Sequence, residues 1–212
     1  MKFIPSFIFL ALPWFVNAQN SGTLGAGNSN ELIEKGLKRL AIEKGMILYK
    51  VEDQPNDTLI VVFDRFGWRE ATMEFGEKKY YGMKTNINTK AVIDGEAYFT
   101  MNLKDKTGKL IIDTDLVKLA GYKNPEELFV ARMSQMKATK IGLETILDKE
   151  CDVWQYTSRG KTCKLWSWKG LELKHYTASN KKVAIKLNLD PSIEEAVFSI
   201  PKDINWKSPE NN

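Results

Sequence analysis

The sequence predicts an α+β fold: a strongly curved antiparallel sheet, an incomplete barrel of about eleven strands, covered by an N-terminal helix and a central helical block. Two patterns predict the sheet. Short segments rich in β-branched and aromatic residues fill most of the chain, and the turns between them are too short for the crossovers that parallel strands need. A third pattern predicts the helices, because two intervals carry helix caps followed by apolar residues at helical spacing.

Residues 1–18 have the pattern of a secretory signal peptide. A basic residue precedes the apolar stretch Phe3–Val16, and small or neutral residues stand before Gln19. The stretch is shorter than the roughly 20 apolar residues of a transmembrane helix, and two prolines interrupt it. No cysteine stands near the cleavage point, so no lipid anchor is expected. We therefore expect a soluble periplasmic or secreted protein, with no transmembrane segment in the mature chain.

The rest of the chain divides by composition. Residues 19–30 are small, polar and glycine-rich, which predicts a flexible leader. Residues 31–206 predict a single domain, of a size that one hydrophobic core supports, and residues 207–212 a disordered tail. The formal net charge of +4 is spread along the chain rather than gathered in a basic stripe, which argues against nucleic acid as a partner.

An N-terminal helix is predicted from Asn30, whose side chain can cap it, to Gly45, which can end it. Acidic residues at its start and basic residues in its later turns suit the helix dipole. Its apolar side consists of Leu32, Ile33, Leu37, Leu40 and Ala41.

The central helical block spans residues 113–136 and contains two starts. Asp115 can cap a short first helix that Gly121 ends. Asn124, followed by Pro125 and two glutamates, predicts the start of a second helix, because it combines a side-chain cap, a preset φ and acids at the positive end of the dipole.

Strands fill the rest of the domain, and two hairpin turns stand out: Asp94-Gly95 and Arg159-Gly160. Around the second turn, large apolar residues occupy both faces of the hairpin, with Val153 and Trp166 on one and Tyr156 and Leu165 on the other. In a sheet with one face exposed to solvent, apolar and polar residues would alternate along each strand. The hairpin is therefore covered on both sides, or one side lines an apolar cavity.

The two cysteines of the chain, Cys151 and Cys163, flank this second turn. A tight turn puts them on opposite faces, too far apart for a disulfide, and only a wide loop or a bulge would bring them together. Export to an oxidising compartment favours a bridge, so both alternatives stay open. Two thiols and the single His175 fall short of four zinc ligands, and the spacing is wider than in redox pairs. We expect no metal and no cofactor.

The segments "GLETILDKECDVWQY", "CKLWSWKGLELK" and "FSIP" resemble the C-terminal half of periplasmic proteins of the outer-membrane lipoprotein carrier and lipoprotein-sorting superfamily. The order of predicted elements, helix, strands, helical block and strands, is similar as well. The resemblance implies a curved, incomplete antiparallel sheet that wraps helices acting as a lid, with acyl chains entering the apolar space between sheet and helices.

We therefore expect a non-enzymatic binding protein that holds an acyl chain, a lipoprotein or another apolar ligand in envelope trafficking. The chain has no GxSxG, HExxH or glycine-rich phosphate loop, so an enzyme is not expected. The alternative is a ligand-free structural or interaction module of the cell envelope with a protein partner. Each expected cavity-wall residue could equally fill a core; they are Trp68, Met73, Phe75, Phe99, Met101, Trp154, Trp166 and Trp168.

Overall fold

The computed structural model describes residues 28–52, 54–80, 83–112, 124–178 and 180–207. The predicted signal peptide, most of the predicted leader, the first helix of the central block and residues 208–212 lie outside the described residues. In the described part of the chain, no helix is both long and apolar enough to cross a membrane.

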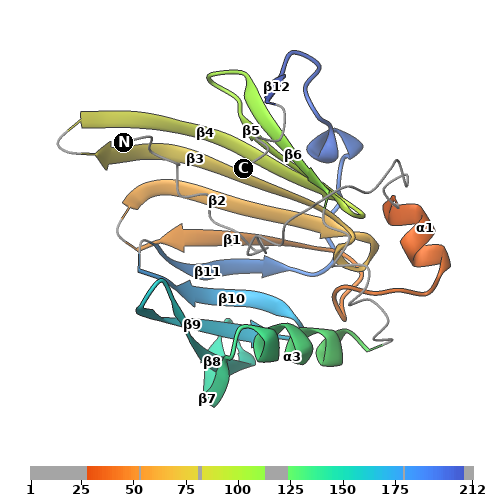
Figure 1. Cartoon of the computed structure of the whole chain (residues 1–212), viewed down its shortest axis with the longest axis vertical. Coiled ribbons are helices and arrows are strands. Elements are labelled where there is room, and N and C mark those ends of the chain that lie inside the picture. Colours follow the sequence, from red (N-terminus) through yellow and green to blue (C-terminus); the bar gives the residue numbers. More distant parts are fainter. Residues whose placement is uncertain (1–27, 53, 81–82, 113–123, 179, 208–212) are drawn as a thin grey trace.

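One unclosed sheet of twelve strands organises the described residues, in the order β12-β6-β5-β4-β3-β2-β1-β11-β10-β9-β8-β7 (Figure 1). Its pairs are antiparallel except β12–β6, a short parallel pair at one edge that the turn pattern did not predict. The predicted incomplete barrel is confirmed. The strands are β1 (Gly45–Val51), β2 (Gln54–Asp64), β3 (Arg69–Tyr80), β4 (Met83–Asp94), β5 (Ala97–Asn102), β6 (Thr107–Ile112), β7 (Thr139–Ile146), β8 (Lys149–Ser158), β9 (Lys161–Trp168), β10 (Leu171–Tyr176), β11 (Lys181–Asn188) and β12 (Asn205–Lys207).

The N-terminal helix is much shorter than the sequence predicts. Helix α1 (Ser29–Glu34) is capped by Asn28, whose side chain accepts from the backbone N–H groups of residues 30 and 31 at 3.0 and 3.1 Å. Gly36, with φ +74°, turns the chain out of the helix. The backbone N–H groups of residues 39 and 40 then donate to Phe66 O at 3.1 and 2.8 Å, which attaches the segment to the short 3-10 helix η1 (Arg65–Gly67) between β2 and β3 in place of further helical turns. Gly45, the predicted helix end, begins β1.

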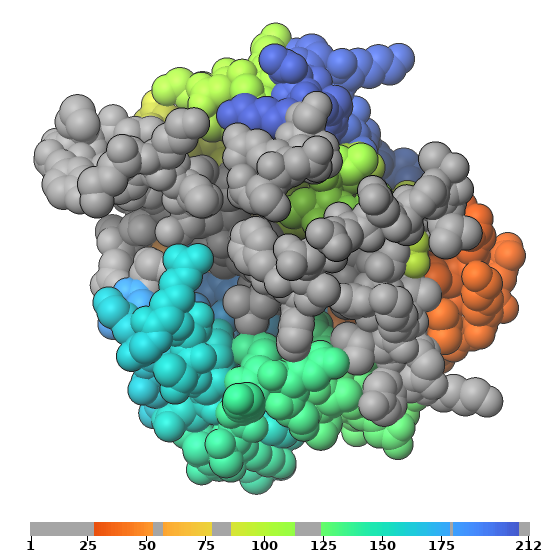
Figure 2. Space-filling model, in the orientation of Figure 1, coloured from red at the N-terminus to blue at the C-terminus, as the bar shows by residue number. Residues whose placement is uncertain are grey.

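Helix α3 (Pro125–Gln135) begins as the sequence predicts. The side chain of Asn124 accepts from the backbone N–H of Glu126 at 2.9 Å, and Pro125 occupies the first turn. The helix buries Leu128 and Met133. It lies at the surface of the space-filling view, in the lower half of the molecule, whereas α1 lies at the right margin (Figure 2).

Both predicted hairpin turns are tight. Ser158 pairs with Lys161 around Arg159 and Gly160, which have φ values of 49° and 73°. The register that follows pairs Val153 with Trp166, as expected from the sequence. Likewise, Asp94 pairs with Ala97 around Gly95, so the predicted turn joins β4 to β5.

The sheet has two differently covered faces. We call the face that contacts α3 the inner face; its apolar side chains on β1, β2 and β9 include Ile47, Val61 and Leu165. The opposite, outer face carries Val62 and Ala71 on β2 and β3, which pair directly across the strands.

Over β2–β5 the outer face is covered by the C-terminal segment, residues 193–207, which we call the strap. It contains the 3-10 helix η2 (Glu195–Phe198) and ends in β12. Phe198 and Ile204 are buried against the outer face. Arg69 donates to Glu195 Oε2 at 2.5 Å, and its guanidinium lies 4.2 Å from the centroid of the Phe198 ring. Charged contacts therefore connect the strap to β3 at the edge of the apolar interface.

Candidate functional site

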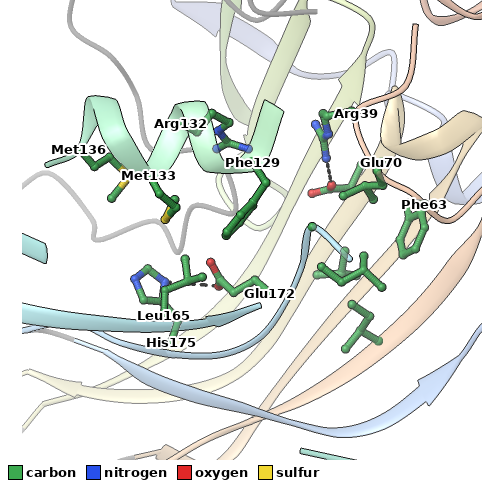
Figure 3. Close-up of a pocket in the computed structure, with 15 residues that line it drawn as sticks. Arg39, Phe63, Glu70, Phe129, Arg132, Met133, Met136, Leu165, Glu172 and His175 are labelled. Atoms are coloured by element: carbon green, nitrogen blue, oxygen red, sulfur yellow. Dashed lines mark hydrogen bonds and ion pairs between the residues drawn. The ribbon is translucent and has the colours of Figure 1, made fainter. Parts of the chain in front are cut away.

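A small cavity lies between α3 and the inner face of the sheet (Figure 3). Its volume is about 50 Å³. Helix α3 forms one side, the segment before β1 forms another, and strands β1–β3, β9 and β10 form the floor. The lining residues are Arg39, Leu40, Ile47, Val61, Phe63, Glu70, Phe129, Arg132, Met133, Met136, Leu165, Gly170, Leu171, Glu172 and His175.

The helix side of the cavity is apolar and rich in methionine. Met133 packs into a buried cluster with Trp154 and Leu165 of the sheet, and Met136 and Phe129 pack against that cluster. The rings of Phe129 and Trp154 meet edge to face, with centroids 6.1 Å apart. Unbranched methionine side chains adapt to irregular apolar surfaces, so this contact can rearrange without loss of burial.

A network of buried polar side chains lies in and directly beside the floor of the cavity. Glu172, His175 and Lys182 are 6%, 4% and 1% exposed. Lys182 Nζ lies 2.5 Å from Glu172 Oε1, His175 Nδ1 lies 3.3 Å from the same oxygen, and His175 Nε2 lies 2.6 Å from Tyr156 Oη. Tyr49 Oη donates to the backbone carbonyl of Glu172 at 2.5 Å. The network ties β1, β8, β10 and β11 together beneath α3.

Glu172 is held as a carboxylate. Burial by itself raises its pKa, but the adjacent His175 and Lys182 outweigh burial and lower the pKa to about 2. Despite the short ionic contact, neither Glu172 Oε1 nor Lys182 Nζ makes a hydrogen bond of good geometry within the described residues. Burial also raises the pKa of Tyr49 well above its ordinary value, so the ring stays neutral.

A second buried ion pair lies at the other end of the cavity. Arg39 Nη2 donates to Glu70 Oε2, and both side chains are almost fully buried. Glu70 is on β3 and pairs with Phe63 and Ile93 across the strands, so its carboxylate points to the inner face. Figure 3 shows this pair and Glu172 facing the same cavity, with Glu70 on β3 and Glu172 on β10.

These residues give the cavity an amphipathic lining. In the described part of the chain, no group of three histidine, cysteine or acidic side chains is placed to hold a metal ion. The apolar walls can take a hydrocarbon group, and the buried ions can take a polar group.

The structure does not bring the eight expected wall residues together, and none of them lines this cavity. Trp154 comes nearest, on the inner face against α3. Trp68 is buried beside α1, where its Nε1 donates to Leu37 O at 3.0 Å. Phe75 is exposed.

The other five expected wall residues lie on the outer face. Three of them, Met73, Phe99 and Met101, pack beneath the strap. Trp166 and Trp168 are on the outer face of β9; Trp166 Nε1 donates to Glu144 Oε2 at 2.6 Å. None of these five side chains lines the cavity, although Trp166 belongs to the same buried cluster as the lining residues Ile47 and Leu171.

Sequence reasoning missed the charged residues of the site. Glu172 and His175 are three residues apart on a strand and would normally point to opposite faces. A register shift between Glu172 and Lys174 puts both on the inner face. The only signal in the sequence is the presence of charged residues within otherwise apolar strand segments.

The two cysteines are free and lie on opposite faces of the β8–β9 hairpin. Cys163 pairs with Tyr156 and packs on the inner face, whereas Cys151 pairs with Glu144 and packs on the outer face. Burial is the main cause that raises the pKa of Cys151 to about 11. A disulfide would require a different register of this hairpin.

The chain is similar in fold to an uncharacterized conserved protein from Thermus thermophilus. The TM-score is 0.51 at 8% sequence identity, over 84% of this chain and 98% of that chain. A solved complex of Pseudomonas aeruginosa MucA/MucB matches with a TM-score of 0.41 and 14% identity, over 76% of this chain and 56% of that chain. The first likeness concerns the fold alone, and the second is too loose to argue from. No family model matches the chain, and no curated protein matches it significantly.

Proposed function

We propose that this protein is an exported, non-enzymatic binding protein that holds an acyl chain, a lipoprotein or another apolar ligand between α3 and the inner face of the sheet. The observation that carries the proposal is the cavity beneath α3, with apolar walls and a charged floor. The signal-peptide pattern supports a periplasmic location, where the protein would serve lipid or lipoprotein trafficking.

The driving force would be transfer of hydrocarbon from water to the apolar walls. Each buried CH₂ group contributes about 0.8 kcal/mol. Phe129, Met133 and Met136 would contact the chain from above, and Val61 and Leu165 from below. Methionine suits a ligand of irregular or variable shape because its side chain adapts.

A cavity of about 50 Å³ has room for one or two water molecules, so α3 has to move to admit a chain. The helix is joined to β7 through Lys137, with φ +53°, and Ala138. A rotation about this short connection would lift the apolar side of α3 from Trp154 and Leu165 and lengthen the cavity along the sheet.

The charged floor indicates that the ligand is an amphiphile rather than a plain hydrocarbon. Glu172 and Lys182 are buried without good hydrogen bonds, and such groups are costly unless a partner satisfies them. A polar end of the ligand could supply that partner while the chain lies against α3.

The test combines mass spectrometry of lipids that co-purify with the exported protein and displacement of a fluorescent apolar probe. The variant Val61→Phe fills the cavity from its floor and should abolish probe binding. The matched control is Val92→Phe, the same substitution at a buried strand residue of the outer face, and it should bind the probe like the wild type. Thermal melts of both variants check that they fold.

Absence of bound lipid together with absence of probe binding by the wild type would overturn the proposal. So would equal loss of probe binding in the two folded variants, because the cavity would then have no special part in it.

One observation favours the alternative, a ligand-free interaction module. Strand β7 is the edge of the unclosed sheet, it is exposed along most of its length, and its Ile141 and Leu143 are 47% and 57% exposed. An exposed apolar edge can pair with a strand of another protein. Gly142→Pro would remove a backbone N–H from this edge; loss of a co-purifying protein, with lipid content unchanged, would support the alternative.

A further inference from the structure

The outer face of the sheet has a second region, over β8–β11, on which the strap does not pack. Lysines and aromatic rings occupy this region. Its residues, which we call the lysine–aromatic face, are Lys149, Lys164, Lys169, Lys174, Lys181, Trp166, Trp168 and Tyr176.

The register places these residues on one side of the sheet. Val153 pairs with Trp166 and Gln155 with Lys164, and on the next strand Trp166 pairs with Lys174. Tyr176 in turn pairs with Lys164 and Lys181. The face therefore runs without interruption across β9, β10 and β11.

The lysine ammonium groups lie close to the aromatic rings of this face. Lys174 Nζ lies 4.3 Å from the centroid of Trp166 and 5.1 Å from that of Tyr176. Lys149 Nζ lies 5.1 Å and the turn residue Lys169 Nζ 5.2 Å from Trp168. Lys174 thus lies over the ring of Trp166, which is also buried among apolar neighbours such as Val153.

Positive charge exceeds negative charge on this face. Glu144 contacts Lys174 at 2.8 Å, and Glu52 accepts from Tyr176. Lys50 and Lys186 extend the face on β1 and β11, where both are exposed. The lysines thus outnumber the glutamates that reach them.

We propose that the lysine–aromatic face docks the protein on the surface of an anionic lipid bilayer. Lysines attract an anionic membrane surface, and tryptophan and tyrosine rings favour the headgroup region. The face is spread over several strands, which suits an extended surface better than a single small anion. This proposal does not depend on the cavity beneath α3.

The test uses sedimentation of the mature protein with phosphatidylglycerol vesicles and with phosphatidylcholine vesicles. Binding is expected to the first and not to the second, and to weaken as salt shortens the range of the attraction. Each lysine near the surface contributes roughly a fivefold factor in the partition coefficient. The variant Lys164→Ala/Lys169→Ala/Lys181→Ala should therefore bind about a hundredfold more weakly.

The matched control is Lys104→Ala/Lys109→Ala/Lys202→Ala, which removes the same charge from exposed lysines outside the lysine–aromatic face. It should bind within about fivefold of the wild type. If both triple variants lost vesicle binding equally, binding would depend on the net charge of the protein and not on this face, and the proposal would be overturned. Absence of binding to phosphatidylglycerol vesicles would overturn it too, as would binding to a soluble polyanion such as polyphosphate without binding to vesicles.

Discussion

The two halves of the sheet are covered in different ways. Over β2–β5 the strap packs apolar side chains, led by Phe198 and Ile204, onto the outer face. Over β9 and β10 helix α3 lies on the inner face, and the buried ion pair of Glu172 and Lys182 lies in the sheet there, with His175 beside it. The strap completes a hydrophobic core, whereas α3 covers a cavity with charges at its floor.

This difference matters energetically. Apolar burial stabilises a fold at about 25 cal/mol per Å² and needs no matched partner. A buried ion pair loses hydration that its attraction rarely recovers, so apolar residues in its place are often as stable or more so. The strap side is therefore organised for stability, and the α3 side retains charge at a cost in stability, as ligand sites commonly do.

The largest expected effect is on the strap side. Phe198→Ala should lower the free energy of unfolding by about 3–5 kcal/mol, because it empties a buried site between strap and sheet. Phe129→Ala, the same change on half-buried α3, should cost only about 1 kcal/mol. Urea denaturation measures both. Equal losses would mean that α3 belongs to the core as firmly as the strap does.

Lys182→Met should have the next largest effect, about 3 kcal/mol, because it leaves Glu172 buried without the ammonium group 2.5 Å away. Glu172→Gln in the same chain should recover most of that loss by removing the unpaired charge. Lys44→Met, which breaks the exposed pair with Asp190, is the control and should leave the urea midpoint unchanged. A double variant no more stable than Lys182→Met would show that the lysine acts through packing instead of charge.

The fold could be read from the sequence where local chemistry decides it. Asn124 and Pro125 fix the start of α3, and the tight turn at Gly160 fixes the register of β8 and β9. The predicted length of the N-terminal helix was wrong because a tertiary contact replaces its later turns. The backbone N–H groups of residues 39 and 40 donate to Phe66 O instead of making the helical hydrogen bonds that propensity favours.

The site could not be read in the same way. Glu172 and His175 share a face only through a register shift that has no signal in the residue types. Glu70 alternates with apolar residues and looks solvent-facing until Arg39 is placed beside it. Apolar residues such as Met101 were expected at a cavity because the sequence does not tell which buried face the strap covers and which α3 covers.

The pH dependence of stability tests whether Glu172 is charged in the folded protein. The pKa of Glu172 falls from 4.5 to about 2 on folding, so its contribution is complete above about pH 4.5 and is lost as the pH falls toward 2. The stability difference between wild type and Glu172→Gln should shrink by about 2 kcal/mol between pH 7 and pH 3. Urea denaturation at both pH values measures it, and parallel pH profiles would contradict the assignment.

The smallest expected effect concerns the cysteines, which report on the two faces of one hairpin. Because Cys151 and Cys163 are free and point to opposite sides, a reductant should leave the melting temperature unchanged, and both should alkylate after denaturation without reduction. In the native protein Cys151 should react slowly at pH 8, since burial raises its pKa to about 11. Alkylation of either residue only after reduction would mean a disulfide, and β8 and β9 would then have to pair in another register, moving Trp154 and Leu165 away from α3.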